Sequence, residues 1–268
     1  MLRAFCGGTL YAQGSEGPGP LVVMLHGWAR SSADFARLGE VAVAHGADVL
    51  NFDLPGFGVS PPPNSPWGSS DYAQAVAGAI AEHLQGRDRQ DFFLLGHSFG
   101  GRVALALAAT SPVGLKEVFV AGVPLFRSAK PAKPRLGYRI LRKAANLSLV
   151  PKETLERYRD RHGSADYRNA QGMMRSIFVR VVNEDYYDFL SAIDVPCHLL
   201  WGELDSAAPL SQAKRALGLL RGGDLEVVSG GDHFAPIAAG GVMERALEAA
   251  LARYRPQDAG NQSAPGGA

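Results

Sequence analysis

Short, largely apolar runs without polar alternation recur along this chain, and they restrict its possible folds more than any other feature. The clear runs are residues 21–25, 92–95, 118–121 and 197–201, and the weaker ones are residues 48–52 and 225–228. Runs of this length without alternation are typical of strands buried on both faces, as in a parallel sheet. The chain is therefore expected to be built around such a sheet.

Helical patterns lie between these runs, over residues 35–44, 72–84, 102–109 and 242–254. Strands that alternate with helices predict βαβ units with right-handed crossovers and a sheet covered on both faces. Residues 2–12, with two glycines in the middle, predict a hairpin at the sheet edge. We expect an α/β fold whose core domain comprises residues 1–125 and 191–255.

The alternation fails over residues 126–190, where the chain is polar and helical in texture. Pro151 suits the first turn of a helix over residues 152–159. Two more helices are expected over residues 172–183 and 184–193. We interpret residues 126–190 as a helical cap, or lid, inserted into the core domain.

Charge is distributed unevenly along the chain. The formal net charge is +1, but residues 126–180 hold 14 Lys and Arg against 4 Asp and Glu. A basic cap would steer an acidic carrier protein, an anionic surface or an anionic substrate towards a site beneath it. The alternative is a solvated helical surface whose cations pair with carboxylates of the core. We find no pattern of aromatic residues interleaved for base stacking, so no nucleic-acid partner is expected.

Other features of the composition exclude several classes of site. Cys6 and Cys197 do not have the spacing of a zinc site or a redox pair, and no metal or organic cofactor is implied. Residues 1–11 lack the pattern of a signal peptide, and no apolar run approaches the roughly 18 residues of a membrane span. We expect a cytoplasmic protein without a transmembrane segment. Residues 256–268, rich in Gly, Pro, Ser, Asn and Gln, are expected to be a disordered tail.

The segment Gly96-His97-Ser98-Phe99-Gly100 is a G-x-S-x-G pattern between a predicted strand and a predicted helix. This context is typical of a serine nucleophile on a tight strand-to-helix turn, where glycine neighbours avoid clashes. The helix N-terminus directs backbone N–H groups towards developing negative charge. Ser98 is therefore the candidate nucleophile, and the alternative is a glycine-rich turn without activity.

A catalytic serine needs a base and a group that orients this base. After a turn of this kind, the acid and then the histidine follow the serine along the chain. Asp205 lies in the loop after the run that ends at residue 201, and it is the preferred acid, with Glu203 as the alternative. His233 lies in a glycine-rich loop after the last predicted strand, so we expect it to be the base.

Two backbone N–H groups are needed to form an oxyanion hole. Phe99, directly after the candidate nucleophile, is expected to supply one, and Trp28, in the loop after an early strand, the other. His26 in the same loop is expected to bond backbone rather than to act as a second base. The loop over residues 52–60 lacks the Gly-Lys-Ser/Thr of phosphate sites, and we expect it to lie beneath the active-site rim.

Five segments together resemble the α/β-hydrolase family. They are residues 26–28 (His-Gly-Trp), 53–60 (Asp-Leu-Pro-Gly-Phe-Gly-Val-Ser), 96–101 (Gly-His-Ser-Phe-Gly-Gly), 201–205 (Trp-Gly-Glu-Leu-Asp) and 231–233 (Gly-Asp-His). They run in the family's order and span the chain except for the cap and tail. The resemblance implies an eight-stranded, mostly parallel sheet with a lid inserted after the sixth strand. The first segment is similar to carboxylesterases that demethylate pimeloyl esters on an acyl carrier protein.

We predict a serine hydrolase that cleaves small-molecule carboxylic esters of short to medium acyl chain. Epoxide hydrolases and haloalkane dehalogenases of the resembled family use an aspartate nucleophile, and Ser98 argues against both. The alternatives are a thioesterase, a hydrolase of carbon–carbon bonds and a non-catalytic ligand receptor on the same scaffold. The residues expected to line the substrate pocket are His97, Tyr138, Met173, Met174 and Phe178.

Overall fold

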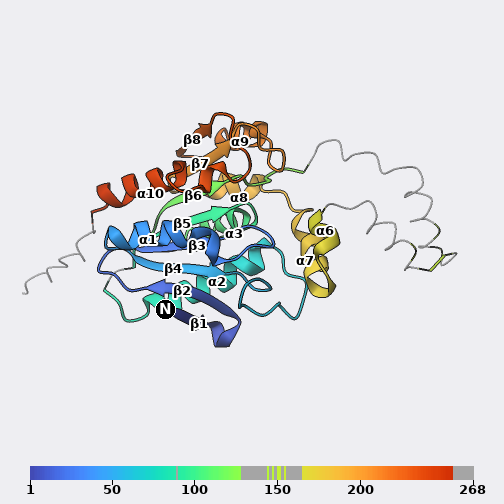
Figure 1. Ribbon diagram of the computed structural model, residues 1–268, viewed down its shortest axis with the longest axis horizontal. Coiled ribbons are helices and arrows are strands. Elements are labelled where there is room, and N and C mark those ends of the chain that lie inside the picture. Colours follow the sequence, from blue (N-terminus) through green and yellow to red (C-terminus); the bar gives the residue numbers. More distant parts are fainter. Residues whose placement is uncertain are drawn as a thin grey trace, which may run out of the picture.

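Eight strands form one sheet within the residues that the computed structural model describes, which are 1–88, 90–127, 165–255 and a few single positions between 144 and 154 (Figure 1). The strands are β1 (Leu2–Phe5), β2 (Leu10–Ser15), β3 (Leu21–Leu25), β4 (Asp48–Asp53), β5 (Phe92–His97), β6 (Leu115–Ala121), β7 (Cys197–Gly202) and β8 (Gly223–Val228). Their order is β1-β2-β4-β3-β5-β6-β7-β8. Strands β3 to β8 run parallel, whereas β1 and β2 form an antiparallel hairpin at the edge. This confirms the mostly parallel sheet and the edge hairpin.

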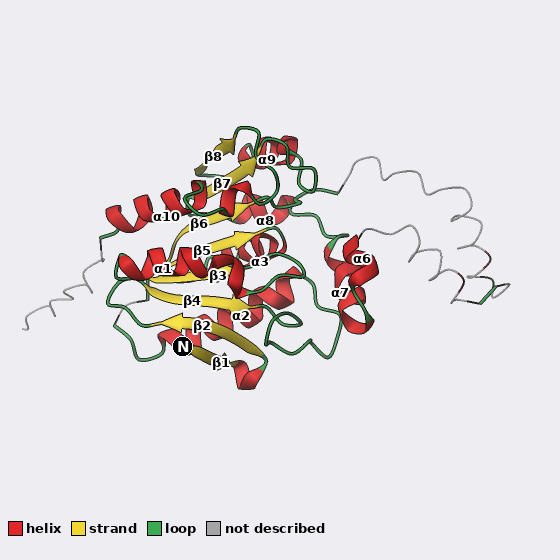
Figure 2. Cartoon of the chain, in the orientation of Figure 1, coloured by secondary structure: helices red, strands yellow, loops and turns green. Residues whose placement is uncertain are grey.

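Helices cover both faces of the sheet (Figure 2). They are α1 (Ala36–Ala44), α2 (Ser69–Leu84), α3 (Phe99–Ala108), α6 (Ala165–Asn169), α7 (Gly172–Val181), α8 (Tyr187–Ala192), α9 (Leu210–Leu217) and α10 (Val242–Arg253). Helices α1 and α10 lie on one face, and α2, α3 and α8 lie on the other. Helices α6 and α7 stand beyond the end of the sheet at which β3 and β5 finish.

Strand β3 shows why the apolar runs predict this sheet. All five of its side chains are buried. Val22 and Met24 pack under α1 and α10, whereas Val23 and Leu25 pack under α2 and α3. A strand covered on both faces has no position for a polar residue, so its sequence does not alternate. Complete burial of each such side chain stabilises the fold by about 1.5–3 kcal/mol.

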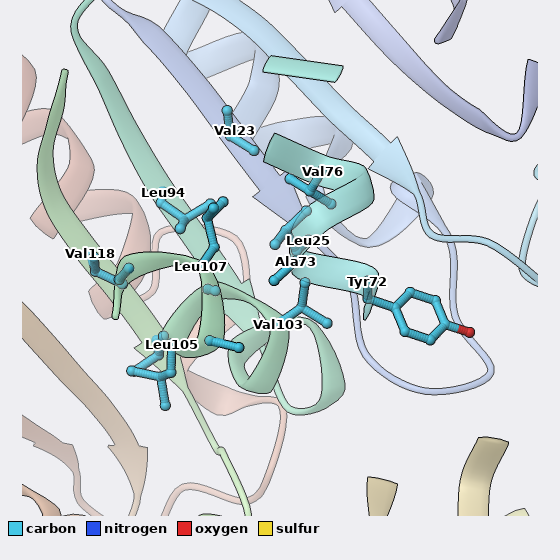
Figure 3. Packing of buried hydrophobic residues seen from close by; sticks show 14 of the residues in the cluster. Val23, Leu25, Tyr72, Ala73, Val76, Leu94, Val103, Leu105, Leu107 and Val118 are labelled. Carbon is cyan, nitrogen blue, oxygen red and sulfur yellow. The ribbon is translucent and has the colours of Figure 1, made fainter. Parts of the chain in front are cut away.

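Helix α3 is the centre of the larger apolar cluster. All ten of its residues are buried. Figure 3 shows Leu107 of this helix next to Leu94 of β5, whereas Val103 lies on the side of Ala73 of α2. Because α3 follows the Ser98 turn directly, this burial fixes the position of the turn relative to the sheet.

Helix boundaries differ from the sequence prediction where side chains cap the ends. Helix α2 begins at Ser69, three residues before the predicted start, because Asp71 accepts a hydrogen bond from the Gly68 N–H at 2.7 Å. Helix α8 begins at Tyr187, three residues late, because Asp185 accepts from the Tyr187 N–H at 3.1 Å. Helix α9 was not predicted.

The predicted cap is only partly described. Its helix over residues 152–159 and the tail over residues 256–268 lie outside the described residues. The boundary predicted at residue 190 falls inside α8, which packs against α3 of the core. Among the helices that are described, none has the length and apolar content needed to cross a membrane.

Candidate active site

Ser98 occupies the turn between β5 and α3 in a backbone conformation that residues with side chains rarely adopt. Its φ is 51° and its ψ is −110°. Such a conformation costs about 1–3 kcal/mol and persists only where the surroundings hold it. The Ser98 N–H donates to the carbonyl of Ala121 at 2.8 Å, and the Ser98 carbonyl accepts from the Arg102 N–H at 3.1 Å. The turn is thus held between the neighbouring strand and the first turn of the buried helix.

Glycines flank Ser98 because the backbone passes too close for any side chain. A Cβ atom on Gly96 would lie 2.6 Å from the carbonyl oxygen of Gly100. A Cβ atom on Gly100 would lie 2.0 Å from the carbonyl oxygen of Leu25, which is a backbone atom of another strand. The glycines of the G-x-S-x-G pattern therefore let the turn seat directly on the sheet.

Asp205 and His233, which lie after different strands, are in direct contact. Nδ1 of His233 lies 2.7 Å from Oδ2 of Asp205. The other carboxylate oxygen of Asp205 accepts from the N–H groups of Ala207 and Ala208, each at 2.8 Å. Burial alone would raise the pKa of Asp205, but the hydrogen bonds from His233, Ala208 and Ala207 outweigh it and lower this pKa. Asp205 is therefore held as a carboxylate that accepts the His233 Nδ1–H.

Gly122 makes room for this contact, and the sequence analysis did not single it out. It follows β6 with a φ of +56°. A Cβ atom there would lie 2.9 Å from Nδ1 of His233 and 3.1 Å from Oδ2 of Asp205. The sequence feature that could have identified Gly122 is its position directly after a predicted strand, in the run Ala121-Gly122-Val123.

The two other carboxylates considered near this site bond to the base loop, residues 229–235. Glu203 accepts from the Gly230 N–H at 2.8 Å and from the Ser229 hydroxyl at 2.9 Å. Asp232 accepts from the N–H groups of Phe234 and Ala235 at 2.9 and 3.0 Å. Both carboxylates stabilise the loop that carries His233, whereas Asp205 contacts the imidazole itself.

Residues 26–31 follow β3 and are held by His26; we call this segment the oxyanion loop after the role predicted for it. The His26 Nδ1–H donates to the carbonyl of Gly27 at 2.7 Å, and Nε2 accepts from the Leu54 N–H at 3.0 Å. Burial lowers the pKa of His26, so the ring is neutral and bonds only backbone, as expected from the sequence. The Trp28 ring packs edge-on against the rings of Phe57 and Phe99.

The loop over residues 53–60 packs against the oxyanion loop and helps to hold it in place. Asp53 accepts from the Ser32 N–H at 2.7 Å and from the Val59 N–H at 3.0 Å, which ties the loop to the chain after the oxyanion loop. Phe57 then reaches the rings of His26 and Trp28. A Cβ atom on Gly58 would lie 2.1 Å from Oδ2 of Asp53, so the bonds that Asp53 makes require glycine at this position.

A cavity of about 560 Å³ opens at these loops. Its lining includes Ser98, His233 and the proposed oxyanion residues Trp28 and Phe99. A cavity of this size is typical of small-molecule sites.

Two of the five predicted pocket residues, His97 and Phe178, line this cavity. Met173 and Met174 are not among its lining residues in the described part of the chain, and Met174 lies over Gly56. Tyr138 lies outside the described residues.

Among the described residues, three arginines line the same cavity, namely Arg30, Arg102 and Arg127, together with one carboxylate, Asp166. Arg102 is almost completely buried, and it donates to the carbonyl oxygens of Pro124 and Val181. The sequence analysis missed Arg102, although its position four residues after Ser98 places it on the same face of α3. No group of three or more His, Cys, Asp or Glu side chains in the described ranges is arranged to hold a metal ion.

The chain matches proteins of known family over most of its length. The profile described as "Alpha/beta hydrolase family" matches residues 22–246. A pimeloyl-[acyl-carrier protein] methyl ester esterase from Aeromonas salmonicida is 31% identical over 213 residues, which cover 72% of this chain and 80% of that protein.

A shorter match involves 2-succinyl-6-hydroxy-2,4-cyclohexadiene-1-carboxylate synthase from Escherichia coli, which is 36% identical over 115 residues. That match spans only 42% of this chain and 43% of the synthase. Among solved structures, an esterase from Exiguobacterium antarcticum superposes with a TM-score of 0.69 at 19% identity, covering 94% of this chain and 99% of the esterase. At this identity the superposition shows the shared fold.

Proposed function

Because the chain belongs to the alpha/beta hydrolase family, we propose that it is a hydrolase that cleaves carboxylic esters through an acyl-enzyme on Ser98. The observation that supports this most is the Asp205–His233 contact of 2.7 Å at the cavity that Ser98 also lines. A carboxylate that orients an imidazole next to a serine on a strained turn is the arrangement that activates a serine hydroxyl.

The proposed reaction follows from the hydrogen bonds. A carboxylate can only accept, so the proton on His233 lies on Nδ1, and Nε2 carries a lone pair. Nε2 takes the Ser98 proton as the hydroxyl oxygen attacks the ester carbonyl, and the resulting imidazolium is stabilised by Asp205. The same proton passes to the leaving alcohol, and water then releases the acid from Ser98 by the reverse sequence.

The oxyanion of the tetrahedral intermediate is proposed to lie between the N–H groups of Trp28 and Phe99. Phe99 is the first residue of α3, and an N–H at this position has no acceptor within its helix. Each such donor contributes roughly 100- to 1000-fold to turnover in enzymes of this kind.

The charged residues of the cavity restrict the class of ester that we propose as the substrate. Of the three arginines in the described part of the lining, Arg30 is paired with Asp34, and Arg102 donates to backbone carbonyl oxygens. Arg127 donates to the side chain of Asn183 rather than to a carboxylate, and it is therefore the arginine whose charge an anionic group would meet. We propose an ester of short to medium acyl chain that also carries an anionic group, either as a small molecule or on an acidic acyl carrier protein. The pimeloyl-carrier esterase to which the chain is similar supports the carrier form.

The first experiment measures hydrolysis of p-nitrophenyl butyrate by the wild-type protein and by Ser98→Ala, with circular dichroism as a check of folding. Loss of turnover in a folded Ser98→Ala variant is the expected result. A folded wild-type protein that turns over neither this ester nor the ester with a terminal carboxylate, described next, would refute ester hydrolysis and favour carbon–carbon bond cleavage or a receptor role.

The second experiment compares a neutral ester with an ester that carries a terminal carboxylate. Arg127→Gln is expected to raise KM for the anionic ester about tenfold, the effect of about 1.4 kcal/mol, and to leave KM for p-nitrophenyl butyrate unchanged. Arg221→Gln, at an exposed position after α9, is the matched control. An equal rise for both esters would contradict recognition of the anionic group by Arg127.

A further inference from the structure

His97 immediately precedes Ser98, yet its side chain points into the protein. It ends β5 and is only 1% exposed. Its Nε2 atom lies 3.0 Å from the backbone carbonyl oxygen of His233. Since a carbonyl oxygen can only accept, the His97 ring carries its proton on Nε2 and donates it to the backbone of the base loop.

The other nitrogen of His97 faces the oxyanion loop. Nδ1 is buried and has no hydrogen-bond partner among the described residues. A Cβ atom on Gly27 would lie 3.1 Å from Nδ1, so the lack of a side chain at Gly27 leaves room for the His97 ring beside this loop. Burial, and next the charge of the nearby His233, lower the pKa of His97 to about 4, so the ring stays neutral at pH 7.

Ring contacts join the same segments. The centroid of the His97 ring lies 4.7 Å from that of His233 and 5.2 Å from that of Phe234. The guanidinium of Arg30, from the oxyanion loop, lies 5.5 Å from the centroid of the Phe234 ring. The base loop therefore contacts both His97 and the oxyanion loop.

We propose that His97 is a positioning residue that sets the spacing of the base loop and the oxyanion loop relative to Ser98. This inference rests on the proposed function, because the spacing of the two loops and Ser98 matters only if all three take part in one reaction. The three segments follow three different strands, β3, β5 and β8, and one rigid, neutral ring contacts all of them. The hydrogen bond from His97 is made to the carbonyl of His233 itself, so it restrains the residue whose imidazole accepts the proton.

Replacing His97 by either of two amide residues tests its hydrogen bond to the carbonyl of His233 separately from the volume of its ring. The amide nitrogen of Gln reaches about as far from the backbone as Nε2 of His, whereas that of Asn is shorter and corresponds to Nδ1. We expect His97→Gln to keep kcat within a few fold of the wild-type value. His97→Asn is expected to lower kcat by on the order of 100-fold with KM unchanged, because a misplacement of about 1 Å costs that much.

Gly27→Ala approaches the same ring from the other side and would displace it by a few tenths of an ångström, so it is expected to lower kcat less than His97→Asn does, without a change in KM. Wild-type kcat in His97→Asn, or equal losses in the Gln and Asn variants, would overturn the proposal. A rise in KM alone would also overturn it, since it would indicate contact with the substrate rather than positioning.

A readout without turnover keeps this test separate from that of ester hydrolysis. The Nδ1–H of His233, shared with Asp205, is expected as a downfield proton NMR signal in the wild type and in His97→Gln. We expect the signal to be broadened or lost in His97→Asn because the base loop then moves. The same signal in all three proteins would refute the positioning role even if the wild type proved inactive on esters, and its selective loss would support it.

Discussion

Gly122→Ala is the substitution for which the structure makes the sharpest prediction. The added methyl group would lie 2.9 Å from Nδ1 of His233, whereas ordinary van der Waals contact begins at 3.4 Å. The imidazole must therefore move by about half an ångström, or the backbone at residue 122 must withdraw. Movement of the imidazole would disturb the 2.7 Å hydrogen bond between His233 and Asp205, and the kcat prediction below applies to this case.

The expected magnitude has a catalytic and a structural part. A displacement of about 1 Å of a reacting group costs on the order of 100-fold, so half of this is expected to lower kcat by about 10- to 100-fold. The φ of +56° at Gly122 adds a backbone cost of roughly 1–2 kcal/mol for alanine. That cost corresponds to a fall in Tm of about 2–4 °C per kcal/mol in a chain of this length.

Gly240→Ala is the matched control, because Gly240 has a φ of +68° and its Cβ would meet nothing within 4 Å. Both variants are expected to lose a similar amount of thermal stability, measured by calorimetry. Only Gly122→Ala is expected to lose turnover of p-nitrophenyl butyrate. If Gly122→Ala keeps kcat within a few fold, or if Gly240→Ala loses as much, contact with the His233–Asp205 pair is not the reason that residue 122 is glycine.

Two further predictions concern carboxylates that hold an imidazole. Asp205→Asn is expected to lower kcat by about 10⁴-fold with folding intact, because an amide no longer fixes the tautomer of the base; near-normal kcat would transfer the acid role to Glu203. His198 bonds to Glu117 at 2.9 Å and Asp224 at 3.1 Å; burial alone would lower the pKa of His198, but these bonds raise it. The pKa of His198 is therefore higher in the folded protein than in the unfolded chain, where it is about 6.5. Its contribution to the free energy of unfolding is fully present below about pH 6.5 and is lost as the pH rises through the pKa of the folded state. His198→Phe should therefore reduce the fall in Tm between about pH 6 and about pH 9, and an unchanged fall would contradict this assignment.

The sheet and the Ser98 turn were predictable because their signals are local. Strand β3 is apolar at every position since both of its faces are covered, and this can be read from five consecutive residues. The turn requires glycine at residues 96 and 100, so a five-residue pattern identifies it. Helix α9 is short and buries only Ala213 and Ala216. Its apolar residues nevertheless recur at helical spacing, from Leu210 through Ala213 to Leu217, so this helix could have been predicted from the sequence.

The candidate site was only partly predictable. Chain order placed Asp205 and His233 in loops after successive strands, but both Asp205 and Glu203 satisfied that order. The loop geometry alone separates them, since Asp205 turns inward to the imidazole and Glu203 turns outward to the Gly230 N–H. No pattern within a few residues records such a difference in direction.

The sequence by itself determined the parallel sheet, the serine turn and the order of the three candidate catalytic residues, because each depends on neighbouring residues or on chain order. Only the tertiary structure decided that Gly122 must leave space beside His233, that Arg102 lines the cavity and that His97 bridges three loops. The physical reason is that these roles depend on distances of a few ångströms between residues more than 50 positions apart in the chain. Those distances exist only once the strands are paired and the helices cover them.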